Sequence, residues 1–155
     1  MWLWQALCAA LLSLAMASAA HADFTGKVVA VADGDTITVM RDLVPVKLRL
    51  LEIDAPEKKQ AFGARSKQSL SDLCFNKTAT LIEKGRDRYG RTLARVSCEG
   101  VDANAEQVRR GMAWVYDRYV TDRALYAVQT EARDAGRGLW ADPAAVPPWQ
   151  WRRGH

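Results

Sequence analysis

The first 22 residues of this 155-residue chain have no charged side chain, although the whole chain has 22 Lys and Arg and 18 Asp and Glu. Residues 7–17 are almost entirely apolar, and residues 20–22 read Ala-His-Ala, a pattern typical of a signal cleavage site. We therefore expect a signal peptide over 1–22 and a mature domain over 23–155, exported to the periplasm or secreted. An uncleaved anchor is the alternative, but the apolar run is short for a membrane span. The rest of the chain lacks a long apolar run, so we expect no membrane association after cleavage.

Histidine and cysteine are scarce, which excludes several kinds of site. The only histidines are His21 and His155, so the expected domain lacks a histidine placed for general-base work, and Ser-His-Asp or Cys-His mechanisms are excluded. Without the signal peptide two cysteines remain, Cys74 and Cys98. An even count in an exported chain predicts a disulfide between them, with two buried free thiols as the alternative. Two cysteines without a matching histidine make a zinc site improbable.

The hydrophobic pattern of the mature chain predicts one domain of mixed strands and helices. A formal net charge of +4 is compatible with a polyanionic partner but is too common to indicate one. Apolar and β-branched residues, with turn residues between them, predict strands over 24–32, 36–40, 44–53, 78–83 and 92–97. Helices are expected over 61–75, 102–111 and 121–135, the last with Thr121 as its N-cap. A tail with three prolines and two tryptophans, from Asp142, is expected to lie extended on the surface.

Five short strands with a helix between the third and the fourth are typical of a small closed barrel. The fold class expected is therefore α+β, mostly β, with a five-stranded OB-fold barrel and three α-helices.

Three acidic residues stand out, two of them at the ends of expected strands. They are Asp35, after the hairpin glycine, and Asp54 and Glu57 in the segment IDAPE. Carboxylates in such positions, with carbonyls nearby, could hold a hard cation such as Ca²⁺ or Mg²⁺. Each also has an ordinary interpretation, because aspartate is common in turns.

Two arginines suggest an anion beside these acids. Arg49 lies between leucines, where a charge is costly to bury unless it is paired, and Arg91 follows a turn. The planar guanidinium matches the oxygens of a phosphate bidentately, although a surface or salt-bridged arginine is the alternative for each. Arg49 and Asp54 are five residues apart, so a regular strand would place them on opposite faces. We expect the chain to bend between them, at residues 54–56.

Together these residues resemble the staphylococcal nuclease (thermonuclease-like) family. The matching segments follow the family's order: VVAVADGDTITV at 28–39, VKLRLLEIDAPE at 46–57, DRYGRTLARV at 87–96, GMAW at 111–114 and GLW at 138–140. The resemblance implies an OB-fold with three helices and a Ca²⁺-dependent phosphodiesterase, an endonuclease acting on DNA and RNA by attack of water. A monomer is expected.

The resemblance also implies a role for each matched residue. By the family's motif, Asp35, Asp54 and the main-chain carbonyl of Ala55 are metal ligands, Glu57 orients or deprotonates the attacking water, Arg49 and Arg91 grip the phosphate, and Tyr89 and Tyr119 contact the substrate. The sequence departs from the staphylococcal enzyme at Ala55, where that enzyme has threonine. A catalytically inactive nucleic-acid-binding OB-fold module is the alternative function; the complete set of acids and arginines argues against it.

Overall fold

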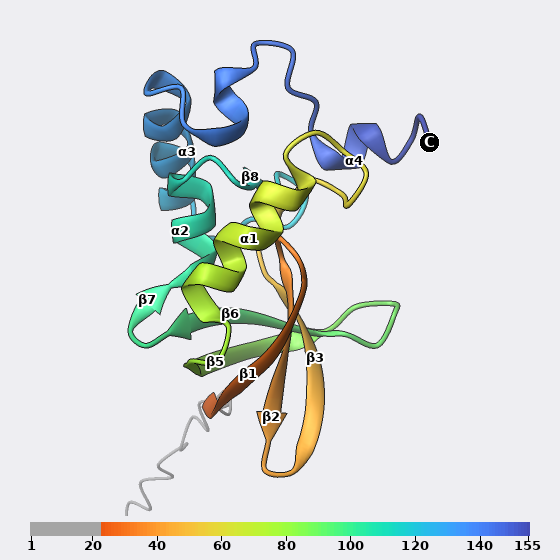
Figure 1. Ribbon diagram of the computed structural model, residues 1–155, viewed down its shortest axis with the longest axis vertical. Helices are drawn as coiled ribbons and strands as arrows, with labels where there is room; N and C mark the ends of the chain where they lie inside the picture. The colour runs from red at the N-terminus through yellow and green to blue at the C-terminus, as the bar shows by residue number, and fades with distance from the viewer. Residues whose placement is uncertain (1–22) are drawn as a thin grey trace, which may run out of the picture.

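Five strands close into a β-barrel in the computed structural model, which describes residues 23–155 (Figure 1). They are β1 (Asp23–Asp33), β2 (Thr36–Arg41), β3 (Val44–Leu50), β5 (Thr78–Arg86) and β6 (Thr92–Cys98). Neighbours pair antiparallel in the order β3-β2-β1-β5-β6, and parallel pairing of β3 with β6 closes the barrel. The predicted OB-fold is confirmed. The predicted signal peptide, 1–22, lies outside the described residues.

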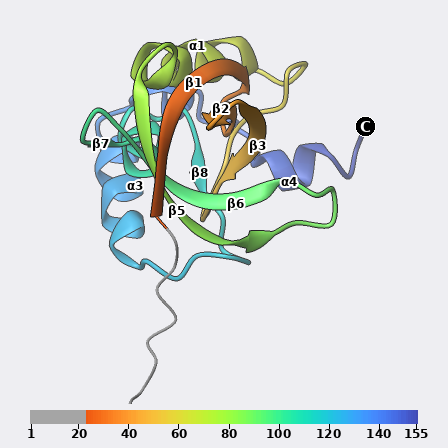
Figure 2. The same cartoon turned by 90° about the horizontal axis from the view of Figure 1, so that it is seen from below.

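Alternating side chains fill the interior of the barrel. In β6 every second residue, from Thr92 to Cys98, is buried, as a strand with one face on a core requires. The long strand β1 curves so that its first half pairs with β5 and its second half with β2. Seen from below, the strands curl around this shared core (Figure 2). The core is made mainly of aliphatic side chains: Val28, Ile37, Val39, Leu48, Leu50, Leu81 and Val96.

The three predicted helices are confirmed, and all three lie toward one end of the barrel (Figure 1). They are α1 (Gly63–Cys74), α2 (Ala103–Arg109) and α3 (Ala124–Asp134). The shorter elements are β4 (Ile53–Asp54), β7 (Val101–Asp102), β8 (Trp114–Val115), the 3₁₀ helix η1 (Gly138–Ala141) and α4 (Pro148–Trp151). No helix within residues 23–155 has the length and apolarity needed to cross a bilayer.

Two expectations about the C-terminal half were wrong. Thr121 does not cap α3, which begins at Ala124, because the main-chain N–H and the hydroxyl of Thr121 donate instead to Glu52. The tail is not wholly extended, since it contains the short helix α4, which begins at Pro148. Proline is favourable in the first turn of a helix because its missing N–H would have had no partner there.

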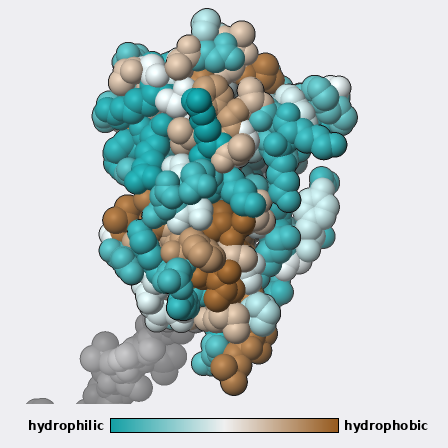
Figure 3. Space-filling view, viewed as in Figure 1, coloured by the Kyte–Doolittle hydropathy of each residue, from teal (hydrophilic) through white to brown (hydrophobic). Residues whose placement is uncertain are grey.

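The surface is largely hydrophilic in the view of Figure 3, with apolar patches across the middle of this face and at the lower tip. That tip is the hairpin between β2 and β3, where Leu43 is 91 % exposed and Val44 is also exposed. The hairpin lies at the end of the barrel away from the helices (Figure 1).

A disulfide joins the end of α1 to the end of β6. Cys74 and Cys98 are 24 residues apart in the sequence, with their Cα atoms 5.3 Å apart, so the predicted pairing is confirmed. Closing a loop of this length should stabilise the fold by about 3–4 kcal/mol, mainly by restricting the unfolded chain. We expect the Cys74→Ala/Cys98→Ala double variant to lose that much free energy of unfolding in urea. A loss below about 1 kcal/mol would contradict this account.

Candidate active site

Asp35 and Asp54 meet around the guanidinium of Arg49. Arg49 Nη2 lies 3.4 Å from Asp35 Oδ2 and 3.0 Å from Asp54 Oδ1. Arg49 Nη1 donates to the carbonyls of Leu50 and Ile53, at 3.0 and 3.1 Å. Although burial opposes its charge, the carboxylates of Asp35 and then Asp54 raise the pKa of Arg49. Three predicted site residues, from the turn before β2, from β3 and from β4, therefore form one ion-paired cluster.

The bend that brings Arg49 and Asp54 together lies earlier than expected. The chain turns at Leu51 and Glu52, directly after β3, and Glu52 has a φ of 68°. The expected position, 54–56, was wrong. A positive φ is unfavourable for a residue with a side chain, so the neighbouring structure must hold it in place.

Glu52 is the anchor of this bend. Its Oε1 accepts hydrogen bonds from the N–H and hydroxyl of Thr121, both at 2.6 Å, and from the N–H of Asp122 at 2.7 Å. Its Oε2 lies 3.0 Å from Arg95 Nη1. Burial alone would raise the pKa of Glu52, but the hydrogen bonds from Thr121 and Asp122 and the charge of Arg95 outweigh it and lower the pKa. Glu52 thus fastens the bend to the segment that leads into α3.

We expect Glu52→Gln to lower the free energy of unfolding by about 1.5–3 kcal/mol at pH 7, the range for hydrogen bonds to a charged group. The pKa of Glu52 is lower in the folded protein than its ordinary value of 4.5. Its contribution to the free energy of unfolding is therefore complete at a pH above 4.5 and is lost as the pH falls through the folded pKa. The free energy of unfolding in urea should therefore fall less between pH 7 and pH 3 in the variant than in the wild type. Equal losses would contradict the anchor role.

Asp35 is held by tight packing of the turn that precedes it. Its Oδ2 accepts the main-chain N–H of Ala55 at 2.8 Å, and its Oδ1 accepts the hydroxyl of Thr36 at 3.0 Å. A side chain at Gly34 would place its Cβ 1.8 Å from the hydroxyl oxygen of Ser66 in α1. Glycine is therefore required here for close approach. The described contact of Ala55 is through its N–H, so the ligand role of its carbonyl stays a prediction.

Glu57 lies at the edge of the cluster, on the loop before α1. Its N–H donates to Gln60 Oε1 at 3.1 Å, and its side chain is 37 % exposed. The described partner of its carboxylate is Arg152, whose Nη1 lies 2.7 Å from Glu57 Oε1. Arg152 belongs to the tail and is not among the site residues predicted from the sequence. The only sequence signal was a pair of arginines beside a tryptophan, WRR.

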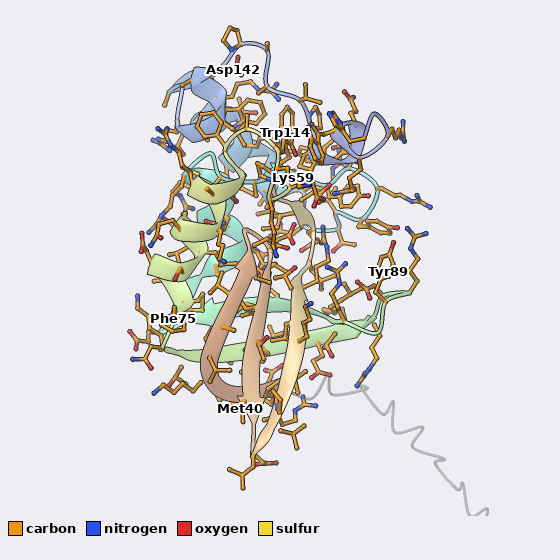
Figure 4. All side chains as sticks on the ribbon, turned by 45° about the vertical axis from the view of Figure 1, so that its right-hand side comes forward. Met40, Lys59, Phe75, Tyr89, Trp114 and Asp142 are labelled. Atoms are coloured by element: carbon orange, nitrogen blue, oxygen red, sulfur yellow. A yellow bond between two sulfur atoms is a disulfide. The ribbon has the colours of Figure 1, made fainter. Side chains whose placement is uncertain are left out.

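Arg91, the second arginine predicted to bind the phosphate, has its partners outside the Arg49 cluster. Arg91 lies directly before β6, whose first residue, Thr92, pairs with Leu48 of β3. Arg91 Nε donates to Asp87 Oδ2 at 2.7 Å, and its guanidinium lies 5.6 Å from the ring centre of Tyr89. The structure therefore places Arg91 and Tyr89 together on the loop between β5 and β6, outside the Arg49 cluster. Figure 4 shows Tyr89 projecting from that loop.

Aromatic rings connect the site to the tail. Tyr116 lies 5.9 Å from the guanidinium of Arg49 and stacks on Trp149 of α4, with ring centres 5.3 Å apart. Trp114 packs edge-on against Trp149 and also contacts Trp140, beneath the C-terminal segment (Figure 4). The predicted substrate residue Tyr119 is exposed and packs edge-on against Tyr116. Tyr116, rather than Tyr119, is the tyrosine near Arg49.

The chemistry of the cluster fits a hard divalent cation, although residues 23–155 contain no ready-made group of three or more His, Cys, Asp or Glu for a metal. Burial and then the charge of Asp35 raise the pKa of Asp33 to about 6. Burial also raises the pKa of Asp54. The hydrogen bond from Arg152 lowers this pKa and the charge of Asp35 raises it, and the net shift is upward. Crowded, buried carboxylates offer the hard oxygen ligands that Ca²⁺ prefers, with carbonyls and waters able to complete its shell.

The barrel and its cluster define an OB-fold protein with acidic and guanidinium groups gathered at the ends of its strands. A model of the family described as "Staphylococcal nuclease homologue" matches residues 47–142. The chain therefore belongs to the staphylococcal nuclease family.

The matches to named relatives cover more of the chain than residues 47–142. A "Micrococcal nuclease" from Shigella flexneri is 44 % identical, over 94 % of this chain and 90 % of its own. An "Uncharacterized endonuclease" from Escherichia coli O157:H7 is 50 % identical, over 84 % of this chain and 86 % of its own. "Protein ParB" from Escherichia coli is 45 % identical, over 94 % of this chain and 88 % of its own.

Proposed function

We propose that this protein is a Ca²⁺-dependent endonuclease that hydrolyses phosphodiester bonds of DNA and RNA by attack of water. The observation that supports this most is the cluster of Asp35, Asp54 and Arg49, with Glu57 at its edge. Membership of a family with nuclease-named relatives supports the same reaction class.

Each role follows from what its side chain can do. Asp35 and Asp54 would hold the cation, which when bound supplies Lewis-acid stabilisation of the charge on the phosphoryl oxygens. Arg49, fixed by two carbonyls, presents a preorganised guanidinium to the same charge. Glu57 can accept a proton from the attacking water, a role that needs no histidine. Arg91 would have to leave Asp87 to reach the phosphate.

We also propose that the protein works as an exported monomer, in the periplasm or outside the cell. The apolar pattern of residues 1–22 and the disulfide support export, since disulfides persist in oxidising compartments. Sequencing the N-terminus of the protein recovered from the periplasm and the medium should give Asp23 as the first residue. Recovery of the intact N-terminus in the membrane fraction would contradict cleavage.

The experiment that tests the activity is incubation of the purified protein with plasmid, single-stranded DNA and RNA, in Ca²⁺ and then in EGTA. We expect cleavage of all three in Ca²⁺ and none in EGTA. Analysis of the product ends would then define the bond broken. Salt-sensitive binding of single strands without cleavage would instead indicate a binding module, because neutralised phosphates release counterions.

A further inference from the structure

Arg152 donates hydrogen bonds to two carboxylates of the proposed active site. They are Asp54, proposed to bind the metal, and Glu57, proposed to activate the water. Arg152 Nη2 lies 2.8 Å from Asp54 Oδ2, and its Nη1 lies 3.2 Å from Asp54 Oδ1 and 2.7 Å from Glu57 Oε1. Arg49 also donates to Asp54 Oδ1. Both oxygens of Asp54, whose side chain is 1 % exposed, therefore face guanidinium groups.

The segment that delivers Arg152 is anchored on the site. We call residues 147–155 the C-terminal arm; it starts just beyond Val146, whose carbonyl accepts a hydrogen bond from Gln60 at 2.6 Å. Pro148 is buried, and the ring of Trp149 lies nearly parallel to that of Tyr116, at 5°. These contacts fix the direction of α4, so that Arg152 points at Asp54. The arm lies beyond residues 47–142, the part matched by the family model.

The charges explain what the arm does there. Without Arg152, Arg49 would be the one described guanidinium on the carboxylates of Asp35 and Asp54, and the carboxylate of Glu57 would have no described partner. The negative charges of these carboxylates would then outnumber the positive charge of Arg49. Asp35 and Asp54 are buried, so uncompensated negative charge on them is costly unless a cation lies nearby. Arg152 supplies one positive charge to these carboxylates, and a divalent cation would supply two. The guanidinium of Arg152 and a divalent cation would bind the same oxygens of Asp54, and their positive charges repel at that short distance, so each disfavours the other there.

We propose that Arg152 is a resident counter-cation that competes with the divalent cation for Asp54 and Glu57, so that cation binding releases the C-terminal arm. This inference rests on the proposed function for the identity of the metal ligands. The arm covers the carboxylates while no cation is bound. On binding, Asp54 exchanges a guanidinium for the cation, and Arg152 and α4 leave the site.

The competition predicts a change in Ca²⁺ affinity, measured by titration calorimetry without substrate. If the arm is closed about 90 % of the time, it weakens the apparent affinity about tenfold, because only the open fraction can bind. We therefore expect Arg152→Gln to bind Ca²⁺ about tenfold more tightly than the wild type. Arg153→Gln is the matched control: it removes the same charge one residue away, from an exposed side chain with no described bond to the carboxylates. It should change the affinity by less than about twofold, the small effect expected of an exposed, screened charge.

Release of the arm can be measured in the wild-type protein by hydrogen exchange. The amides of Gln150, Trp151 and Arg152 donate to the carbonyls of Pro147 and Pro148. A helix this short is not stable alone, so a released arm should lose this protection. Saturating Ca²⁺ should speed exchange of these amides at least about tenfold, and in Arg152→Gln they should exchange quickly even in EGTA.

The outcomes separate this inference from the proposed function. Equal Ca²⁺ affinity in the wild type and Arg152→Gln, or unchanged arm exchange in Ca²⁺, would overturn the competition while leaving a calcium nuclease intact. Weaker Ca²⁺ binding by Arg152→Gln would also overturn it and would make Arg152 a supporting residue of the bound state. Equal tightening in Arg152→Gln and Arg153→Gln would reduce the effect to general electrostatics. No Ca²⁺ binding by any variant would overturn both proposals.

Discussion

Replacing Arg49 with lysine is expected to lower the rate of DNA cleavage by about 10²- to 10³-fold, the scale for losing a preorganised electrostatic partner. Arg49 uses Nη1 on the carbonyls of Leu50 and Ile53 and Nη2 on Asp35 and Asp54. Lysine keeps the charge but offers a single ammonium on a flexible stem, so it cannot hold both sets of partners. Because the charge is unchanged, a lower cleavage rate would report the loss of the guanidinium geometry rather than the loss of a positive charge.

The measurement is single-turnover cleavage of a short duplex at saturating Ca²⁺, with the free energy of unfolding measured in parallel. Arg41→Lys is the matched control, because Arg41 is also a barrel arginine paired to a carboxylate, that of Glu83. It lies at the hairpin end of the β2–β3 ladder, whereas Arg49 pairs with Thr36 at the other end. The control should cleave at the wild-type rate. A loss below about tenfold in Arg49→Lys would contradict the assigned role.

The parts of the fold that could be predicted are those governed by neighbours in the sequence. The strand over 92–97 and the hairpin at Gly34 depend on a few adjacent residues, and both are present, as β6 and as a turn at Gly34 and Asp35. The start of α3 is a counterexample. Thr121 is a good N-cap by local rules, but its hydroxyl is used 69 residues away, on Glu52. A long-range hydrogen bond thus overrode a local preference.

The site was predictable to the extent that a family motif names its residues. The meeting of Asp35, Arg49 and Asp54 followed from that motif and from one geometric requirement, a bend in the chain. The position of the bend did not, because the positive φ of Glu52 is stabilised by partners that only the fold brings near. Arg152 is the extreme case, since it reaches Asp54 across 98 residues. Nothing local distinguishes it from its neighbour Arg153.

Replacing Glu57 with glutamine is expected to lower cleavage by about 10²- to 10⁴-fold, the range for losing a general base. Glutamine has nearly the same shape but cannot take a proton from water. The fold should tolerate the change, because the side chain is 37 % exposed and its described partner is Arg152. The free energy of unfolding should therefore stay within about 0.5 kcal/mol of the wild type, as for ordinary surface substitutions.

Calcium affinity distinguishes a loss of chemistry from a loss of the metal. In Glu57→Gln, Arg152 loses one of its two carboxylate partners, so Ca²⁺ should bind as well as in the wild type or slightly more tightly, while cleavage falls. Glu131→Gln is the matched control, because Glu131 is an exposed glutamate on α3, paired with Arg137, and its replacement should change neither quantity. If Glu57→Gln cleaved at near the wild-type rate, the proton would have another acceptor and Glu57 would serve only to hold the arm. If cleavage and Ca²⁺ affinity fell together, Glu57 would be a metal ligand rather than the group that activates water.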